Sequence, residues 1–273
     1  MSTNYAKYLE STGTHYISNS GSDERGKYSG GTAGDQTGKE WQLKAWYNRP
    51  WSVVLRHPDQ AVALKIAQLG IEAALNDKIG YDQGQRTTYW TQLKAAGYDP
   101  AKIATPCEED CTAGVTANVK AAGYLLGIQA LQALAIDTYS GNMKNRFVAA
   151  GFKALTTSKY LTSGKYLLPG DILLYEGHHA ATNVTIGAAV RGDWKPGAAP
   201  TPTVTGPDRP YVEVTGDSVY VRMGPDTTYG AMGVAHKGDR LRYFGYTYTN
   251  DWALVEYAGQ TAWISRKFTK IVE

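Results

Sequence analysis

The sequence predicts an α+β protein in which a large mixed domain is followed by a small all-β barrel. Helix-period segments occur between residues 57 and 155, and two apolar strand-like runs follow between residues 167 and 190. After residue 211, short apolar runs alternate with turn signals and no helical spacing competes with them. We therefore expect helices and strands in the first part and strands alone in the second.

A proline-rich segment separates the two parts. KPGAAPTPTVTGPDRP, residues 195–210, contains five of the 11 prolines together with small and polar residues. Such a composition favours extended conformations and buries little apolar surface, so the segment is expected to be a semi-rigid linker. The domains are accordingly placed at residues 1–194 and 211–273.

Four segments of the large domain have helical spacing of small or apolar residues. They are His57–Asp77, Thr87–Pro100, Cys111–Leu126 and Gly141–Leu155. Leu167–Val190 is expected to contain two strands, with the apolar runs ILLY and VTIGAAV around a histidine pair.

The small domain shows strand-like alternation from its start. Val212 and Val214, then Val219 and Val221, recur at every second residue, and Gly-Asp or Asn-Asp pairs stand at the turns. About five strands in so short a segment favour a closed β-barrel.

Composition excludes some classes of function and favours others. The net charge of +3 is small, and no Lys/Arg run would follow a nucleic-acid backbone. The chain has 20 Tyr and 7 Trp but only 4 Phe, which suits wet binding grooves for sugars or peptides, although a β-rich fold also raises Tyr. We expect a soluble globular protein that does not bind nucleic acid.

No targeting segment is evident in the sequence. MSTNYAKYLESTGTHYISNS lacks a basic start followed by an apolar stretch, and no run approaches the roughly 18 apolar residues that span a bilayer. The two cysteines, Cys107 and Cys111, are too few for a disulfide framework. The chain is therefore expected to be made in the cytoplasm without a signal peptide and without a membrane span.

Cys111 stands where a helix is expected to begin. Asp110 before it is a suitable N-cap, and the unpaired N–H groups of a helix start favour a thiolate. A neighbouring imidazole would stabilise the thiolate and later protonate a leaving amine, which makes Cys111 a candidate nucleophile. A lone cysteine in an Ala/Val-rich helix can equally be a small core residue.

The histidine pair offers the candidate base. His178 and His179 follow PGDILLYEG, and adjacent strand residues face opposite ways, so one of them points to the side of the cysteine helix. A zinc site made of this pair with Cys107 and Cys111 is an alternative, although one centre could hardly use both histidines. Both histidines could also be structural.

Two motifs resemble those of the NlpC-type peptidases, a papain-like family of cysteine hydrolases that act on peptidoglycan. The first is DCTAGV from Asp110, with Thr112 where the family usually has Ser, and the second runs from PGDI at Pro169 to His179-Ala180. By this resemblance the large domain is papain-like, Cys111 is the nucleophile and His179 is the base. No metal or other cofactor is implied.

The residue that orients the histidine in this family lies on the strand after it, and that strand is missing here. Instead, Asn19–Trp51 resembles a segment that relatives, many of them phage-encoded, carry after the histidine strand, as if the domain were circularly permuted. The resemblance places Asn19 at the position of the orienting polar residue, with His15 as the second choice.

Further residues are expected to contact substrate. The aromatic segment WYNRPW contributes Trp46 and Trp51, which either line a groove or pack the core, and Asp110 either holds a substrate amine or only caps the helix.

The small domain resembles bacterial SH3-type wall-binding domains. SVYVRMGPDTTYG, KGD and DWALVEYAGQTAWISRKF match the family's pattern, with Tyr220 in place of the usual Asn. The resemblance implies binding to the peptidoglycan peptide or cross-bridge, and Tyr220, Tyr229 and Trp252 are the candidate contacts.

Together the two resemblances imply a peptidoglycan hydrolase of the endolysin or autolysin type. The first choice of activity is a D-γ-glutamyl–diamino-acid endopeptidase, and the alternative is an N-acetylmuramoyl-L-alanine amidase. A protein that acts on the wall after phage or prophage lysis, or after non-classical export, would need no signal peptide. A catalytically decayed wall-binding protein and a transglutaminase-like acyl transferase are the remaining alternatives.

Overall fold

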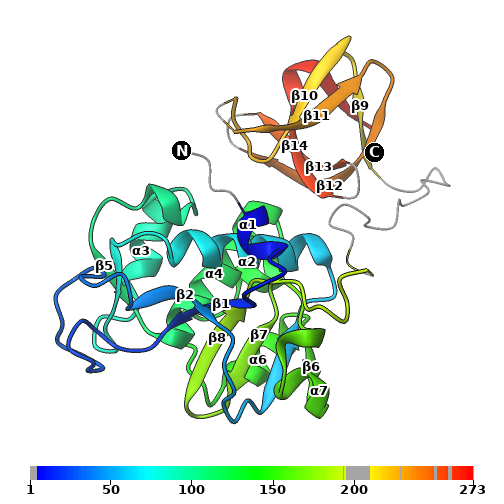
Figure 1. Cartoon of the computed structure of the whole chain (residues 1–273). Helices are drawn as coiled ribbons and strands as arrows, with labels where there is room; N and C mark the ends of the chain where they lie inside the picture. Colours follow the sequence, from blue (N-terminus) through cyan, green and yellow to red (C-terminus); the bar gives the residue numbers. More distant parts are fainter. Residues whose placement is uncertain are drawn as a thin grey trace. The chain divides into compact units, whose positions relative to one another are not determined.

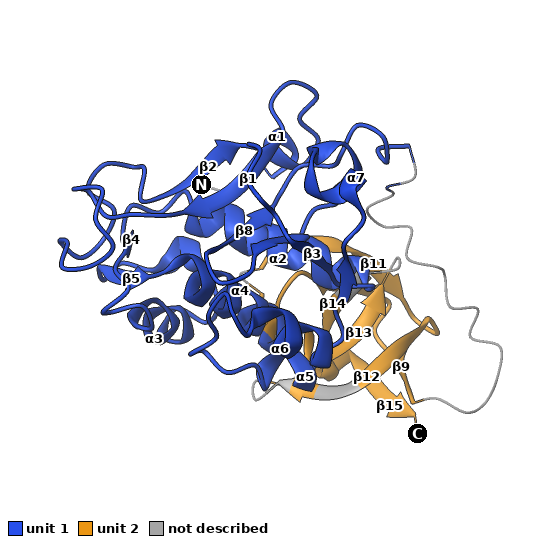
Figure 2. Cartoon of the chain, turned by 90° about the horizontal axis from the view of Figure 1, so that it is seen from below, with its two compact units in different colours: residues 1–124, 128–194 blue, residues 125–127, 195–273 orange. Residues whose placement is uncertain are grey.

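The computed structural model describes residues 5–192, 194, 210–227, 229–248, 251–257 and 260–272. The chain forms two compact units, residues 1–124 with 128–194, and residues 125–127 with 195–273 (Figure 2). Apart from Pro210, the predicted linker lies outside the described residues.

Unit 1 contains helices and strands in mixed order (Figure 1). The elements are α1 (Ala6–Leu9), β1 (Tyr16–Ser20), β2 (Trp41–Ala45), β3 (Val53–Arg56), α2 (Gln60–Ala73), β4 (Ile79–Tyr81), α3 (Thr88–Ala95), β5 (Cys107–Glu109), α4 (Cys111–Leu126), α5 (Gln129–Gln132), α6 (Met143–Ala149), β6 (Lys153–Leu155), α7 (Ser158–Leu161), β7 (Ile172–Tyr175) and β8 (His179–Asn183). The α+β prediction is confirmed as a mixed helix-and-sheet fold, but three strands precede the main helices instead of following them.

Within residues 5–192 the main sheet has six antiparallel strands in the order β2-β1-β8-β7-β3-β6. The strand from the start of the chain, β1, thus lies beside the histidine strand β8, pairing Ile17 with Asn183 and Ser18 with Thr182. A separate parallel pair, β4 and β5, leads into α4.

The two faces of the main sheet are covered by different segments. On one face α2 packs on β1 and β8, and Ser18 Oγ donates a 2.7 Å hydrogen bond to the Gly70 carbonyl of α2. On the other face Ile17 and Ala181 join an apolar cluster with Trp51 and with residues of α7. Successive residues along β1 and along β8 therefore face opposite sides of the sheet, as Ile17 and Ser18 do.

Helix α4 is buried over most of its length in unit 1, and its small side chains explain how other elements can pack closely around it. Its first turns consist mainly of Ala, Gly, Thr and Val, whose small side chains let other elements approach closely, and Cys111 to Gly123 are buried throughout. Its one amide, Asn118, accepts a 2.7 Å hydrogen bond from Tyr89 on α3. The predicted bounds of this helix are confirmed.

Two predicted elements differ from the structure. The helix expected over residues 141–155 ends at Ala149, because Gly151 adopts a left-handed φ of 104° and Lys153–Leu155 pairs with β3 instead. The second strand expected around the histidine pair begins at His179 and ends at Asn183, so the whole VTIGAAV run lies beyond it.

The described part of unit 2 is an all-β barrel-like sheet with one short 3₁₀ turn. Its seven strands are β9 (Tyr211–Val214), β10 (Ser218–Arg222), β11 (Ala231–His236), β12 (Arg240–Tyr248), β13 (Trp252–Tyr257), β14 (Gln260–Ser265) and β15 (Thr269–Val272). Val212, Val214, Val219 and Val221 form part of its core, as their alternation predicts. The strands are more numerous than expected because β9 and β15 form an additional antiparallel pair.

Candidate active site

The start of α4 is fixed by Asp110. Its Oδ1 accepts hydrogen bonds from the backbone N–H groups of Thr112 (3.0 Å) and Ala113 (2.8 Å), which confirms the predicted N-cap. These bonds satisfy N–H groups that have no partner within the helix. Cys111 is therefore held rigidly as the first residue of the helix.

Arg86 binds the same carboxylate from a distant loop. Its Nε lies 2.6 Å from Asp110 Oδ2 and its Nη2 lies 2.9 Å from Oδ1, while Nη2 also donates to the Thr138 carbonyl. Both oxygens of Asp110 are thus engaged within the protein. This geometry supports the capping role of Asp110, and its contact with a substrate amine stays a prediction.

Cys111 lies next to the beginning of β8. Cys111 is buried, with 8% of the residue exposed, and its sulfur accepts a hydrogen bond from the backbone N–H of Ala180. The neighbouring charge of Asp110 acts on His179 and opposes the lowering of the His179 pKa. Residues 110–111 and 179–180 are therefore neighbours, although they are far apart in sequence.

His179 is held by Asn19 across two strands. Both residues lie on the same face of the β1–β8 pair, and His179 Nε2 lies 2.9 Å from Asn19 Oδ1. Because an amide oxygen only accepts hydrogen bonds, Nε2 must carry the proton. The other ring nitrogen, Nδ1, then has the free lone pair that a base requires.

The other two histidines considered in this region lie elsewhere. His178 is exposed, stacked on Tyr175 with ring centroids 4.2 Å apart in the β7–β8 turn. His15 Nε2 lies 2.6 Å from Asn183 Oδ1, toward the opposite end of β8 from His179. The structure therefore brings Cys111, His179 and Asn19 together and leaves His15 and His178 outside this group.

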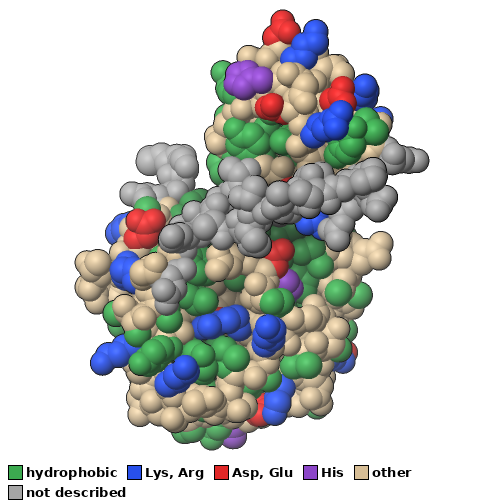
Figure 3. All heavy atoms as spheres, turned by 90° about the vertical axis from the view of Figure 1, so that its right-hand side faces the viewer, with side chains coloured by type: hydrophobic (Ala, Val, Ile, Leu, Met, Phe, Trp, Pro, Cys, Tyr) green, Lys and Arg blue, Asp and Glu red, His purple; other side chains and the backbone are tan. Residues whose placement is uncertain are grey.

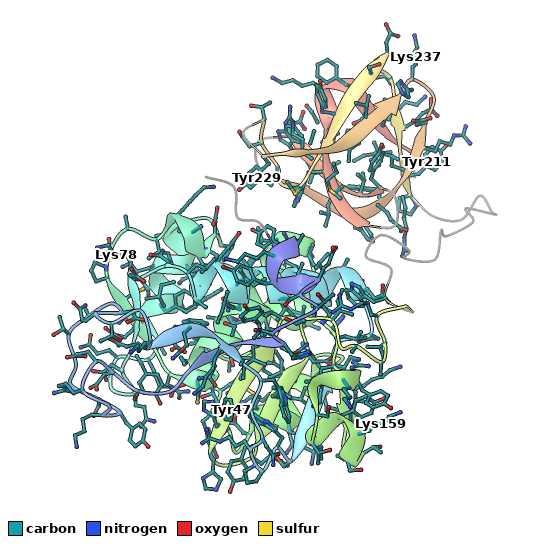
Figure 4. All side chains as sticks on the ribbon, viewed as in Figure 1. Tyr47, Lys78, Lys159, Tyr211, Tyr229 and Lys237 are labelled. Atoms are coloured by element: carbon teal, nitrogen blue, oxygen red, sulfur yellow. The ribbon has the colours of Figure 1, made fainter. Side chains whose placement is uncertain are left out.

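The segment after β2 covers the His179–Asn19 pair. Tyr47, labelled in Figure 4, donates a 3.1 Å hydrogen bond to Asn19 Oδ1, the atom that also accepts from His179. Trp51 lies 5.9 Å from the His179 ring, centroid to centroid, and is 4% exposed. Trp51 is thus a buried neighbour of the histidine and not an open groove wall, while Trp46 is half-buried in the same apolar cluster.

Burial keeps the thiol and the imidazole neutral in the unliganded protein. Burial, with the charge of Asp110 adding to it, raises the pKa of Cys111 to about 12, against the opposing effect of its bond with Ala180. Burial, followed by the charges of Arg49 and Lys44, lowers the pKa of His179 to about 3. Burial therefore opposes the thiolate that the helix start was expected to favour.

Glu109 packs against the first turn of α4, next to Gly114. It is fully buried, and burial raises its pKa well above the usual range, which favours the uncharged carboxyl. A Cβ at Gly114 would lie 2.1 Å from Glu109 Oε2 and 2.8 Å from the Trp41 ring. Only glycine fits at this place in the helix.

The zinc alternative receives no support from the geometry. Across the described residues no group of three or more His, Cys, Asp or Glu side chains is arranged to hold a metal ion. Cys107 lies in β5, where its Sγ is 3.6 Å from the Lys78 carbonyl. Burial raises the pKa of this thiol to about 12 as well.

Of the three residues predicted to bind the wall, the structure places one in the core. Trp252 is 7% exposed and packs with Leu254 and Trp263, which corrects the expectation that it contacts ligand. Tyr220 is 57% exposed on β10, directly opposite Val234 on β11. Tyr229, labelled in Figure 4, is half-buried in the loop between these strands.

Sequence reasoning missed Arg86 and Tyr47. Each contacts a site residue far along the chain, Asp110 for Arg86 and Asn19 for Tyr47, and no sequence spacing reports these contacts. The charge pattern of the surface gives no further signal, because Figure 3 shows Lys and Arg interspersed with polar and hydrophobic side chains on the face of unit 1 that it displays.

Comparison with protein families identifies both units. The family model of an endolysin-like domain matches residues 17–190, which include β1, the start of α4 and β8. The chain belongs to the endolysin-like domain family. A bacterial SH3 domain matches residues 217–270 of this endolysin-like protein. No curated protein and no solved structure was found to match it.

The two matches support a peptidoglycan hydrolase with a C-terminal domain that binds the cell wall. They confirm the predicted pairing of an endolysin-like domain with an SH3-type domain. In the described part of the endolysin-like protein, no helix is both long enough and apolar enough to span a bilayer.

Proposed function

We propose that this endolysin-like protein hydrolyses an amide of the peptidoglycan stem peptide through Cys111, with His179 as the base and Asn19 as the orienting residue. The hydrogen bond between His179 Nε2 and Asn19 Oδ1 carries the proposal, because it directs a free Nδ1 lone pair away from Asn19. Cys111, whose sulfur accepts a hydrogen bond from the backbone N–H of Ala180, supplies the nucleophile.

The reaction begins from a neutral pair. His179 Nδ1 takes the thiol proton as sulfur attacks the amide carbonyl, and backbone N–H groups at the start of α4 stabilise the oxyanion. The tetrahedral intermediate expels the amine, which takes the proton from His179, and leaves a thioester on Cys111. Water then attacks the thioester with His179 as base, which releases the carboxylate product and restores the thiol.

We also propose that unit 1 has a permuted papain-like fold. In the order of this chain, the strand that carries the orienting residue comes first, and it still lies beside the histidine strand. The nucleophile begins an enclosed helix, and the base begins a strand of an antiparallel sheet. Both the papain-like fold and the thiol mechanism are part of the proposal.

The bond that we assign first is the one between D-γ-glutamate and the diamino acid of the stem. The alternative is the amide between N-acetylmuramic acid and L-alanine. The SH3 domain would hold the enzyme at its insoluble substrate and raise its effective concentration there. The protein would act on the wall after lysis or export.

Mass spectrometry of digested peptidoglycan tests the activity and names the bond. We expect the wild type to release a free diamino-acid amine, Cys111→Ala to release nothing, and Cys107→Ala to match the wild type. Cys107 is the matched control because it is also a buried thiol but lies outside the site. Full digestion by Cys111→Ala would refute the thiol mechanism, and a wild type that releases no product would favour a decayed wall-binding protein.

The dependence on a metal can be tested on the same walls. We expect EDTA to leave digestion intact and iodoacetamide to abolish it. The reverse pattern would favour a metal-dependent hydrolase.

A further inference from the structure

Two cations lie beside His179 without an acidic partner. Arg49 Nη1 donates a 3.3 Å hydrogen bond to the Tyr47 hydroxyl, and Lys44 Nζ lies 4.8 Å from the centroid of the Tyr47 ring. Across the described residues neither side chain forms an ion pair, whereas Arg25, Arg56, Arg86 and Arg146 each do. Lys44 is exposed and Arg49 half-buried, so both are open to a ligand.

The nearby acids offset this charge only in part, because Asp110 acts on His179 less strongly than Arg49 and Lys44 do. Asp110 is paired with Arg86, and burial raises the pKa of Glu109 well above its usual range, which favours its uncharged form. Both cations act on His179 strongly enough to lower its pKa, second only to burial itself. The surroundings of the candidate base therefore carry an excess of positive charge.

The sheet places one of these cations on the face that carries the base. Lys44 of β2 is directly opposite Ile17 of β1, and Ile17 shares its face with Asn19, which meets His179. Tyr47 contacts all three parts of the arrangement, since its ring lies under Lys44 and its hydroxyl bonds with both Arg49 and Asn19. The Tyr47 side chain thus contacts both cations and also Asn19, the hydrogen-bond partner of the base.

We propose that Arg49 and Lys44 form a carboxylate-binding subsite that takes the free α-carboxylate of a γ-linked glutamyl residue on the acyl side of the scissile bond. This inference rests on the proposed function, and it favours cleavage of the bond between D-γ-glutamate and the diamino acid over cleavage of the amide between muramic acid and L-alanine. A γ-linkage leaves the α-carboxylate free a few bonds from the reacting carbonyl, where a guanidinium can bind it through two N–H groups. The amide between muramic acid and alanine has no carboxylate in that place.

Hydrolysis of paired soluble stem peptides tests the subsite. One peptide has the glutamyl α-carboxylate free, the second has it as the carboxamide, and the third has only the diamino-acid carboxyl amidated. We expect the wild type to show a KM roughly 10- to 100-fold higher for the glutamyl carboxamide and little change for the third peptide, at similar kcat. Equal KM values for the first two peptides would overturn the proposal, and so would a penalty confined to the third.

Charge-removing variants assign the effect to the two cations. Arg49→Gln should raise KM for the free carboxylate by at least about tenfold and abolish discrimination against the carboxamide, while Arg49→Lys keeps part of it. Lys44→Met should act in the same direction. Lys94→Met is the matched control, because Lys94 is also exposed and lies 5.7 Å from the Trp90 ring centroid. A loss of the same size for both peptides in Arg49→Gln would contradict a carboxylate subsite.

Binding to an inactive variant separates this inference from the proposed function. Calorimetry with full-length Cys111→Ala should show tighter binding of the free carboxylate peptide than of the carboxamide, and Arg49→Gln in that background should remove the difference. This result would support the subsite even if the wild type cleaved neither peptide, in which case the proposed hydrolysis alone would fail. Equal binding of both peptides would reject the subsite whatever the activity.

Discussion

His179 Nε2 lies 2.9 Å from Asn19 Oδ1, although 160 residues separate the two in the sequence. The contact depends on β1 and β8 lying side by side, because the two residues are diagonal neighbours on one face of that strand pair. Tyr47 donates to the same oxygen, so two donors fix the orientation of the amide. The arrangement leaves the imidazole in a single tautomer.

Asn19→Ala should therefore lower kcat by about 100-fold, since the ring loses both its tautomer lock and its orientation. Tyr47→Phe should give a smaller loss, because it removes one of the two donors that hold the amide. Steady-state kinetics on a soluble stem peptide, together with thermal unfolding of each variant, provides the measurement. An unchanged kcat in a folded Asn19→Ala protein would exclude Asn19 from the mechanism.

The reactivity of Cys111 toward iodoacetamide should increase continuously with pH. Burial raises the pKa of this thiol to about 12, so the reactive thiolate fraction grows roughly tenfold per pH unit from about pH 6 to about pH 9. Alkylation rates in the Cys107→Ala background report this single thiol. A rate that is independent of pH around neutrality would instead indicate a preformed thiolate–imidazolium pair.

The first turn of α4 should tolerate no side chain at Gly114. A Cβ there would meet Glu109 Oε2 and the Trp41 ring, so Gly114→Ala should reduce the free energy of unfolding by about 1–3 kcal/mol. Gly13→Ala is the control, because a Cβ at Gly13 has no neighbour within 4 Å. Denaturant unfolding of both variants measures the effect, and equal stabilities would show that the turn yields to the methyl group.

Two aromatic residues of the SH3 domain should respond in opposite ways to truncation. Trp252→Ala should cost about 3–5 kcal/mol of folding free energy, because the ring is buried against Leu254 and Trp263. Tyr220→Ala should leave stability nearly unchanged and weaken binding to purified walls, because the ring is largely exposed. Co-sedimentation with walls and thermal unfolding separate the two effects, and unimpaired binding by Tyr220→Ala would remove this residue from the wall contact.

Local signals allowed part of this architecture to be predicted. The N-cap at Asp110 and the bounds of α4 follow from a capping residue and small side chains within one segment. The placement of Asn19 beside His179 agrees with a family resemblance, whereas composition alone would not have paired the two residues. The endolysin-like and SH3-type domains were predicted from the resemblance of their motifs to known families and are confirmed by the family matches.

Other features depend on contacts that no local pattern reports. Arg86 reaches Asp110 from another loop, and the state of the Cys111 thiol depends on how deeply the helix start is buried. Trp252 and Tyr220 both occur in strands of the small domain, and only the packing of the barrel decides that the first is core and the second exposed. The left-handed Gly151 ends α6 and allows the next residues to pair with β3.

Trapping of the acyl-enzyme tests the proposed mechanism most directly. Wild-type protein mixed with a soluble stem peptide and quenched in acid should gain the mass of the acyl fragment, and peptide mapping should place that mass on Cys111 as a thioester. Cys107→Ala should give the same adduct and Cys111→Ala none. Hydrolysis that continues in Cys111→Ala, with no adduct on any cysteine of the wild type, would contradict the account.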